Sequence, residues 1–147
     1  MAWTTDDLGR LSTAEIYDIT LSSGPRKALQ TDIGNEGFWS DVGFHALAHS
    51  FSRAPTHRLN VLMGNGKRVG NGLPNLNGGA YKSQFENRIR DAVRRGDTVD
   101  AMVEPVYFSP NSSARPDQFR TSYRVNGGDW IEHTFDNVSC TSRPTAP

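Results

Sequence analysis

One stretch of the chain, residues 80–95, repeats apolar side chains at the spacing of an amphipathic helix. Charged residues occupy most of the remaining positions and Gly96 follows as a candidate C-cap, so this stretch predicts the principal helix. A shorter helix is expected over residues 28–35, ended by Gly34. The apolar side of the principal helix comprises Tyr81, Phe85, Ile89, Ala92 and Val93.

The last third of the chain has the pattern of antiparallel strands. Residues 98–109 alternate apolar and polar positions, which predicts a half-buried strand. Residues 119–125 and 130–135 flank Asn126-Gly127, a dipeptide typical of tight turns, and predict a hairpin.

The first half of the chain is less regular. Residues 13–21 and 58–63 predict strands bounded by turn residues. Residues 42–51 fit either a strand that enters a loop or a short helix. Residues 64–79 are rich in glycine and asparagine, and they predict a loop that is long for a compact domain.

Antiparallel strands around one principal helix favour an α+β fold with a small antiparallel sheet. The length of 147 residues is that of a single domain, which we expect to span residues 1–147 with a tail over residues 138–147. Hydrophobic residues make up 35% of the chain and form no stretch long enough for a membrane span, so we expect no membrane partner.

The distribution of charge along the chain bears on whether it can bind nucleic acid. The 16 basic and 16 acidic residues cancel, so a nucleic-acid partner needs a local basic cluster rather than a global field. The single cysteine, Cys140, excludes an intramolecular disulfide and a four-cysteine zinc site. The start of the chain is acidic and has no apolar segment, so we expect no signal peptide. A candidate basic cluster comprises Arg88, Arg90, Arg94 and Arg95.

Candidate chemistry begins with the four histidines, of which His45 and His49 lie four residues apart. No glutamate stands between them, so the zinc-protease pattern is absent. A single histidine is most often structural, and we interpret His49 and His133 in that way. Only the surrounding motifs give His45 a catalytic interpretation.

Several short motifs supply that context by their order along the chain. Together they resemble the bacterial DNA/RNA non-specific endonuclease family over residues 7–137. The motifs are Asp-Val-Gly-Phe-His at 41–45, Leu-Asn-Val-Leu-Met at 59–63, Asn-Leu-Asn-Gly-Gly-Ala-Tyr-Lys at 75–82, Glu-Asn at 86–87, Arg-Pro-Asp-Gln-Phe at 115–119 and Tyr-Arg-Val-Asn-Gly at 123–127.

The resemblance implies a ββα-metal nuclease core and a role for each of five residues. His45 matches the general base that activates water, and Asn77 matches the asparagine that binds a divalent metal. Glu86 matches the helix glutamate that orients water at the metal. Arg26 matches an arginine near the scissile phosphate, and Asn60 matches a supporting asparagine. Histidine suits base catalysis near neutral pH because its ordinary pKa is about 6.5.

The implied function is a metal-dependent, sequence-nonspecific endonuclease acting on DNA or RNA, with Mg²⁺ or another divalent cation as cofactor. The resemblance further implies a secreted toxin domain, delivered as the C-terminal module of an exported protein, with a possible cognate immunity protein as partner. The alternatives are a catalytically degenerate nuclease fold that binds nucleic acid or protein, and an interaction module whose histidines only pack.

Four departures from the family pattern bear on activity. Phe44 replaces a glycine beside His45, and strand alternation predicts that its ring points into the core, away from the base. Ser52-Arg53 replaces a Gly-Gly pair. Glu86 follows Asn77 by nine residues, one more than is usual in the family, which turns it to another helix face unless Asn77 precedes the helix. Residues 64–74 form an apparent insertion, and Asn75 is the second candidate for the metal ligand.

Overall fold

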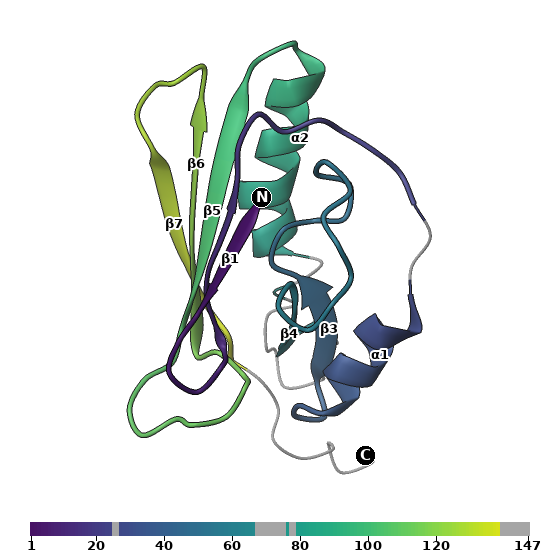
Figure 1. The fold of residues 1–147 in the computed structure, drawn as a ribbon, viewed down its shortest axis with the longest axis vertical. Coiled ribbons are helices and arrows are strands. Elements are labelled where there is room, and N and C mark those ends of the chain that lie inside the picture. Colours follow the sequence, from purple (N-terminus) through teal and green to yellow (C-terminus); the bar gives the residue numbers. More distant parts are fainter. Residues whose placement is uncertain (25–26, 67–75, 77–78, 139–147) are drawn as a thin grey trace, which may run out of the picture.

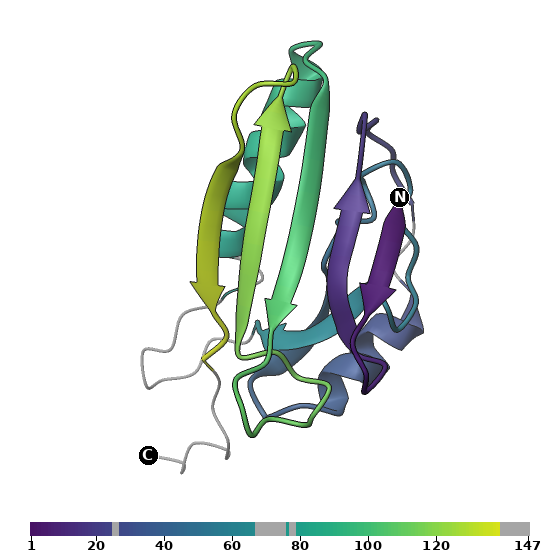
Figure 2. The same ribbon diagram turned by 60° about the vertical axis from the view of Figure 1, so that its left-hand side comes forward.

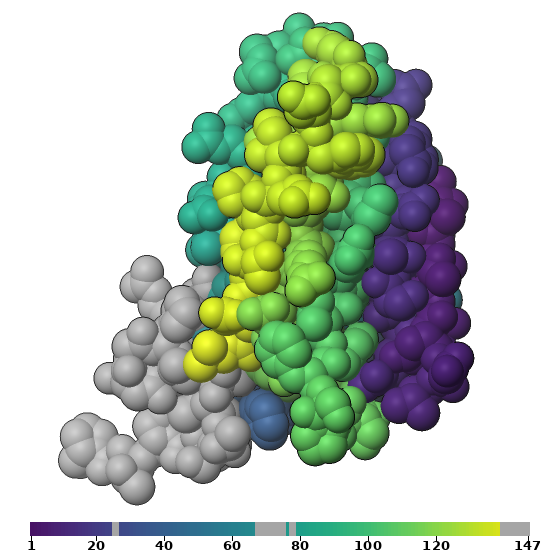
Figure 3. All heavy atoms as spheres, turned by 90° about the vertical axis from the view of Figure 1, so that its left-hand side faces the viewer, coloured from purple at the N-terminus to yellow at the C-terminus, as the bar shows by residue number. Residues whose placement is uncertain are grey.

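The computed structural model describes residues 1–24, 27–66, 76 and 79–138. Its largest element is an antiparallel five-stranded sheet in the order β1-β2-β5-β6-β7 (Figure 2). One face of this sheet lies on the molecular surface (Figure 3), and the other carries the rest of the fold (Figure 1). The strands are β1 (Ala2–Thr5), β2 (Leu11–Ile16), β5 (Val99–Val106), β6 (Gln118–Val125) and β7 (Ile131–Asp136).

A second antiparallel sheet contains β3 (Asp41–His45) and β4 (Val61–Asn65). Helix α1 (Ala28–Asn35) packs directly on the backbone of β3 (Figure 1). A Cβ atom on Gly43 would overlap the carbonyl oxygen of Gln30, so glycine is required for this close approach. The side of β3 that carries Gly43 therefore faces α1.

The principal helix expected over residues 80–95 is confirmed, but it is not uniformly α-helical. It begins with a π-helical segment, η1 (Lys82–Glu86), and continues as α2 (Asn87–Arg94). The backbone N–H of Asn87 donates to the carbonyl of Lys82, five residues earlier. A π turn of this kind inserts one extra residue into a helix.

The core lies between the large sheet, the principal helix and β3. The Phe44 side chain is only 1% exposed. Its ring makes edge contacts with Tyr81 and Phe119, at centroid distances of 5.3 and 5.0 Å. The predicted inward orientation of Phe44 is thus confirmed, and strand alternation places His45 on the opposite side of β3, together with Gly43.

Two buried polar contacts attach the small sheet to the large one. The Arg115 guanidinium donates to both carboxylate oxygens of Asp41, at 2.7 and 3.0 Å, and so holds the start of β3 against the β5–β6 connection. The side chain of Asn137 donates to the carbonyls of Met63 and Pro116 and accepts from the N–H of Asn65. The motif residues Asp41 and Arg115 thereby have a structural role.

The overall class is α+β, as predicted, with antiparallel strands and two helices. The helix over 28–35 and the hairpin strands are confirmed, and Asn126 and Gly127 both have positive φ, as their turn requires. Residues 42–51 form a strand only as far as His45. Strand β1 was not predicted, because its sequence, Ala-Trp-Thr-Thr, is short and mostly exposed.

The strand expected over residues 13–21 instead spans Leu11–Ile16, and the one expected over 58–63 spans Val61–Asn65. The predicted loop over 64–79 therefore begins later than expected, and most of it lies outside the described residues. Nearly all of the predicted tail lies outside them as well. Within the described part of the chain, no helix has the length and apolar character needed to cross a membrane.

Replacing Phe44 with alanine is expected to lower the free energy of unfolding by about 3–5 kcal/mol, because it empties the space between Tyr81 and Phe119. Urea denaturation measures the loss. Phe108→Ala is the matched control, since Phe108 is 51% exposed and its removal should cost less than about 1 kcal/mol. Equal losses in the two variants would contradict the central position of Phe44.

Candidate functional site

The candidate site is built around the long connection between β3 and β4, residues 46–60, which runs alongside the principal helix (Figure 1). His45 is the last residue of β3 and stands where this connection begins. Its Nε2 atom lies 2.8 Å from the hydroxyl oxygen of Thr56. When Nε2 carries the proton and donates to Thr56, the basic lone pair of the neutral ring is on Nδ1.

A second imidazole lies beside the first. The ring of His49 is 6.0 Å from that of His45, measured between centroids. Its Nδ1 lies 2.8 Å from the carbonyl oxygen of Ala54. A carbonyl can only accept, so Nδ1 must carry the proton, and Nε2 has the lone pair in the neutral ring. Gly24 leaves room for that nitrogen, because a Cβ there would overlap Nε2.

Asn60 holds the connection in shape from inside the protein. Its side chain is fully buried and donates to the carbonyls of Leu47 and Pro55, both at 2.9 Å. Its amide oxygen accepts from the N–H of Leu47 at 3.0 Å and from the indole of Trp3 at 3.4 Å. The asparagine side chain thus supplies the hydrogen bonds that backbone partners would supply in a helix or strand. It supports the site and does not face it.

The segment before α1 fixes the far part of the connection. Leu21 forms a β-bridge with Phe51, and the Ser52 N–H donates to the Thr20 carbonyl at 2.7 Å. Ser52 and Arg53 have φ angles of 47° and 57°, in the left-handed region that favours glycine. Two larger residues thus occupy a backbone conformation that glycine adopts more easily.

Glu86 is the last residue of the π turn, and its neighbour Arg90 links it to the same connection. Its carboxylate lies 3.5 Å from the Arg90 guanidinium, which also donates to the Ser50 hydroxyl at 3.1 Å. Tyr81, on the same helix, donates its hydroxyl to the Ala46 carbonyl at 2.8 Å. Two contacts therefore join the helix that carries Glu86 to the segment that directly follows His45.

Burial sets the protonation behaviour of this helix face. Burial raises the pKa of the Glu86 carboxyl, and the nearby charges of Arg90 and Lys82 only partly oppose this rise. Burial also raises the pKa of the Tyr81 hydroxyl well above its ordinary value, with a further contribution from the charge of Glu86. Glu86 is therefore a carboxyl group with a higher affinity for its proton than a glutamate in water.

Of the predicted site residues, His45 precedes the β3–β4 connection, Asn60 ends it, and Glu86 is linked to it through Arg90, which contacts Ser50. Arg26 and Asn77, and the second-choice ligand Asn75, lie outside the described residues. No group of three or more His, Cys, Asp or Glu side chains suited to a metal ion occurs in the described part of the chain.

Sequence reasoning missed three residues that contact the predicted ones. Thr56 and Ser50 carry no pattern that could have revealed them, because each meets its partner only in the folded chain. His49 had a detectable pattern, its spacing of four residues from His45, but His49 was interpreted as structural.

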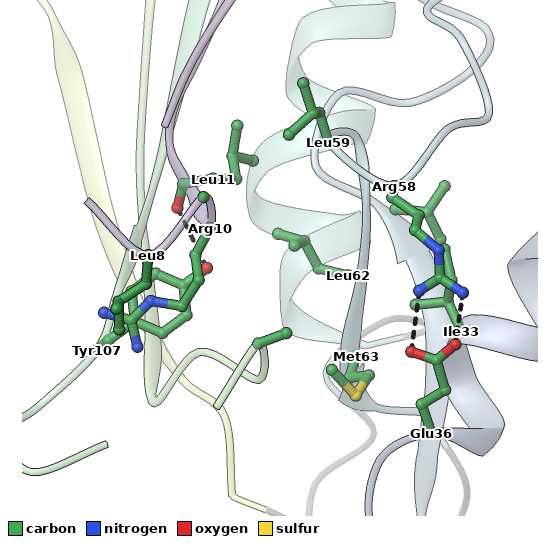
Figure 4. Close-up of a pocket in the computed structure, with 13 residues that line it drawn as sticks. Leu8, Arg10, Leu11, Ile33, Glu36, Arg58, Leu59, Leu62, Met63 and Tyr107 are labelled. Carbon is green, nitrogen blue, oxygen red and sulfur yellow. Dashed lines mark hydrogen bonds and ion pairs between the residues drawn. The ribbon is translucent and has the colours of Figure 1, made fainter. Parts of the chain in front are cut away.

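A separate cavity of about 210 Å³ opens between the β1–β2 turn and the start of β4 (Figure 4). Apolar side chains line most of it, and the Arg58–Glu36 ion pair also contributes to its lining. None of His45, Asn60 and Glu86 contributes to this cavity, so it is distinct from the candidate site.

Replacing Asn60 with leucine is expected to cost about 3 kcal/mol or more of unfolding free energy, because two buried carbonyls and one N–H lose their partner. Chemical denaturation measures the loss. Asn87→Ala serves as control, since the Asn87 amide oxygen accepts only from the Arg90 side chain among the described contacts. A loss of less than about 1 kcal/mol in Asn60→Leu would show that the connection does not depend on this amide.

Glu86→Gln is expected to be more stable than the wild type at pH 7, with a gain that shrinks as the pH falls. The raised pKa means that the native state binds the Glu86 proton more tightly than the unfolded state does. Ionisation of Glu86 therefore opposes folding as the pH rises above the ordinary value of about 4.3. Denaturation midpoints of both proteins, measured between about pH 4 and pH 8, give the difference in stability at each pH.

Glu132→Gln, at an exposed position of β7, is the matched control for removal of one negative charge. A Glu86→Gln gain that does not change with pH would contradict the raised pKa.

No protein-family model matches this chain, and no curated protein matches it in sequence. The function of the site must therefore be inferred from its own residues.

Proposed function

We propose that this chain is a metal-dependent, sequence-nonspecific endonuclease that hydrolyses phosphodiester bonds of DNA or RNA. The observation that carries the proposal is the sequence of elements β3, β4 and helix, with His45 at the end of the first strand and Glu86 on the helix. This order matches a ββα-metal core. Arg90 and Tyr81 attach the helix to the segment that follows His45.

The π turn accounts for the unusual spacing of Glu86. The sequence has one residue more between Asn77 and Glu86 than is usual in the resembling family. A π turn absorbs one residue, so side chains beyond it keep the helix face they would have without the insertion. The π turn at Lys82–Glu86 therefore supports the assignment of Glu86 despite the extra residue.

His45 supplies the base in this proposal. An imidazole takes a proton from water near neutral pH, because its ordinary pKa is about 6.5. Thr56 contacts Nε2 and so orients the ring, and with the proton on Nε2 the proton-accepting atom is Nδ1. An oriented ring presents its lone pair in one direction, and this orientation is what a general base requires.

A divalent cation fits the donor atoms that the chain offers. Glu86 and Asn77 are oxygen donors, the type that Mg²⁺ prefers, and the buried Glu86 carboxyl has only one long ion pair, to Arg90, among the described contacts. Asn77 would hold the cation and Glu86 would orient water beside it. The cation would neutralise the charge that develops on the phosphate during cleavage. Arg26 would bind the same phosphate by a forked contact.

A Phe44 ring that stood over His45 would favour the alternative of a catalytically inactive fold. That ring packs between Tyr81 and Phe119, on the other side of β3 from His45. This position supports the active interpretation. Delivery as part of an exported toxin, and a cognate immunity protein, remain predictions that follow from the resemblance.

The purified protein is expected to nick and then degrade plasmid DNA in Mg²⁺ and to be inactive in EDTA. His45→Ala should reduce the cleavage rate by about 10²-fold or more, because it removes the general base. His133→Ala is the matched control, since His133 lies on β7 in the large sheet and contacts no residue of the candidate site among the described contacts.

Circular dichroism of both variants establishes that they are folded. Cleavage of plasmid by folded His45→Ala at the wild-type rate would refute the assignment of the base. An RNA substrate, tested in parallel, distinguishes a nuclease for both polymers from one for DNA alone.

A further inference from the structure

Two neighbouring residues of the β3–β4 connection have a backbone conformation that is unfavourable for them. Ser52 and Arg53 both have left-handed φ angles, 47° and 57°. A side chain at such a φ crowds the following carbonyl oxygen, and glycine avoids this cost. Strain of this kind persists where the surroundings impose it, and it often marks functional positions.

The surroundings do impose the conformation. The N–H of Ser52 donates to the Thr20 carbonyl, and the N–H of Arg53 donates to the Ser22 hydroxyl at 3.1 Å. Ser52 also uses its side chain, because its hydroxyl oxygen accepts from the N–H of Thr20 at 3.0 Å. That contact offsets part of the strain at Ser52.

Arg53 has no such structural use. Its side chain is exposed, and within the described part of the chain its guanidinium makes no hydrogen bond or ion pair. Most other arginines that the structure describes contact a carboxylate, as Arg58 and Arg115 do. A strained position thus carries an exposed cation that contributes nothing visible to the fold.

The location of Arg53 supplies the reason. It directly precedes Ala54, whose carbonyl fixes His49, and it lies three residues before Thr56, which contacts His45. The chain has a net charge of zero, so a polyanionic substrate must be held by cations placed locally at the site. A guanidinium can bind a phosphate with two parallel hydrogen bonds.

We propose that Arg53 binds a backbone phosphate of the nucleic-acid substrate, and that the strained Ser52–Arg53 backbone is retained because it presents an exposed guanidinium on the same connection that holds the two histidines. The inference rests on the proposed function in taking nucleic acid as the ligand. It adds a binding residue at a position where the resembling family has glycine and therefore no side chain.

The experiment compares Arg53→Ala, Arg53→Gly and Arg53→Lys with the wild type. Binding of a fluorescein-labelled single-stranded DNA oligonucleotide is followed by anisotropy in EDTA over a series of salt concentrations, and urea midpoints are measured for each protein. Arg120→Ala is the matched control, because Arg120 is exposed on β6 of the large sheet.

Arg53→Ala and Arg53→Gly should bind more weakly, and the slope of log K against log salt should become shallower by about 0.7, the value for one phosphate contact with a single strand. Arg53→Lys and Arg120→Ala should keep the wild-type slope. Arg53→Gly alone should also raise the urea midpoint, because glycine relieves the left-handed strain while alanine does not.

Unchanged affinity and slope in Arg53→Ala and Arg53→Gly would overturn the phosphate contact, and so would an equal effect of Arg120→Ala. A urea midpoint of Arg53→Gly no higher than that of Arg53→Ala would overturn the role of strain. Plasmid cleavage by the wild type in Mg²⁺ separates the two proposals. Arg53-dependent binding without cleavage refutes the nuclease function alone, and cleavage without Arg53-dependent binding refutes the Arg53 contact alone.

Discussion

Burial of Phe44 is the contact on which the arrangement of the candidate site depends. Its ring packs edge-on against Tyr81 and Phe119, and so joins β3 to both the principal helix and the large sheet. Because side chains alternate along a strand, a fixed Phe44 leaves His45 only the opposite side of β3, the side on which Gly43 meets α1. The orientation of the proposed base is thus a consequence of hydrophobic packing one residue away.

Beyond His45 the chain has no ladder of hydrogen bonds to maintain its shape, and polar side chains take over that task. Asn60 satisfies two carbonyls and one N–H of the β3–β4 connection from a fully buried position. A buried amide that lost these partners would be costly, so the connection and Asn60 stabilise each other. The result is a rigid support for two imidazoles, one held by Thr56 and the other by the Ala54 carbonyl.

Two local departures from regular geometry occur close to this support. The π turn at Lys82–Glu86 accommodates an extra residue in a helix, and the left-handed pair Ser52–Arg53 accommodates side chains where glycine fits best. The left-handed φ angles are unfavourable for residues with a side chain, and burial raises the pKa of the Glu86 carboxyl in the π turn. Local departures of this kind are common at functional sites, so their closeness to one connection is consistent with the proposed function.

The sequence by itself determined the elements whose residues interact locally. Helical spacing predicted the principal helix, alternation predicted β5, and Asn126-Gly127 predicted the β6–β7 hairpin. These signals are local, because periodicity reflects which side of an element is buried and turn residues reflect the φ angles that the turn needs. Alternation also predicted the inward Phe44. The roles of Arg26 and Asn77, by contrast, stay predictions, since both lie outside the described residues.

Only the tertiary structure decided the contacts that assemble the site. Strand β1, which brings Trp3 to Asn60 across 57 positions of sequence, is too short to be recognised from its sequence alone. The contact of Arg90 with Ser50 spans 40 positions and follows from how the helix packs on the connection. Such partners depend on the long-range packing of the whole core, and no local pattern of residues encodes them.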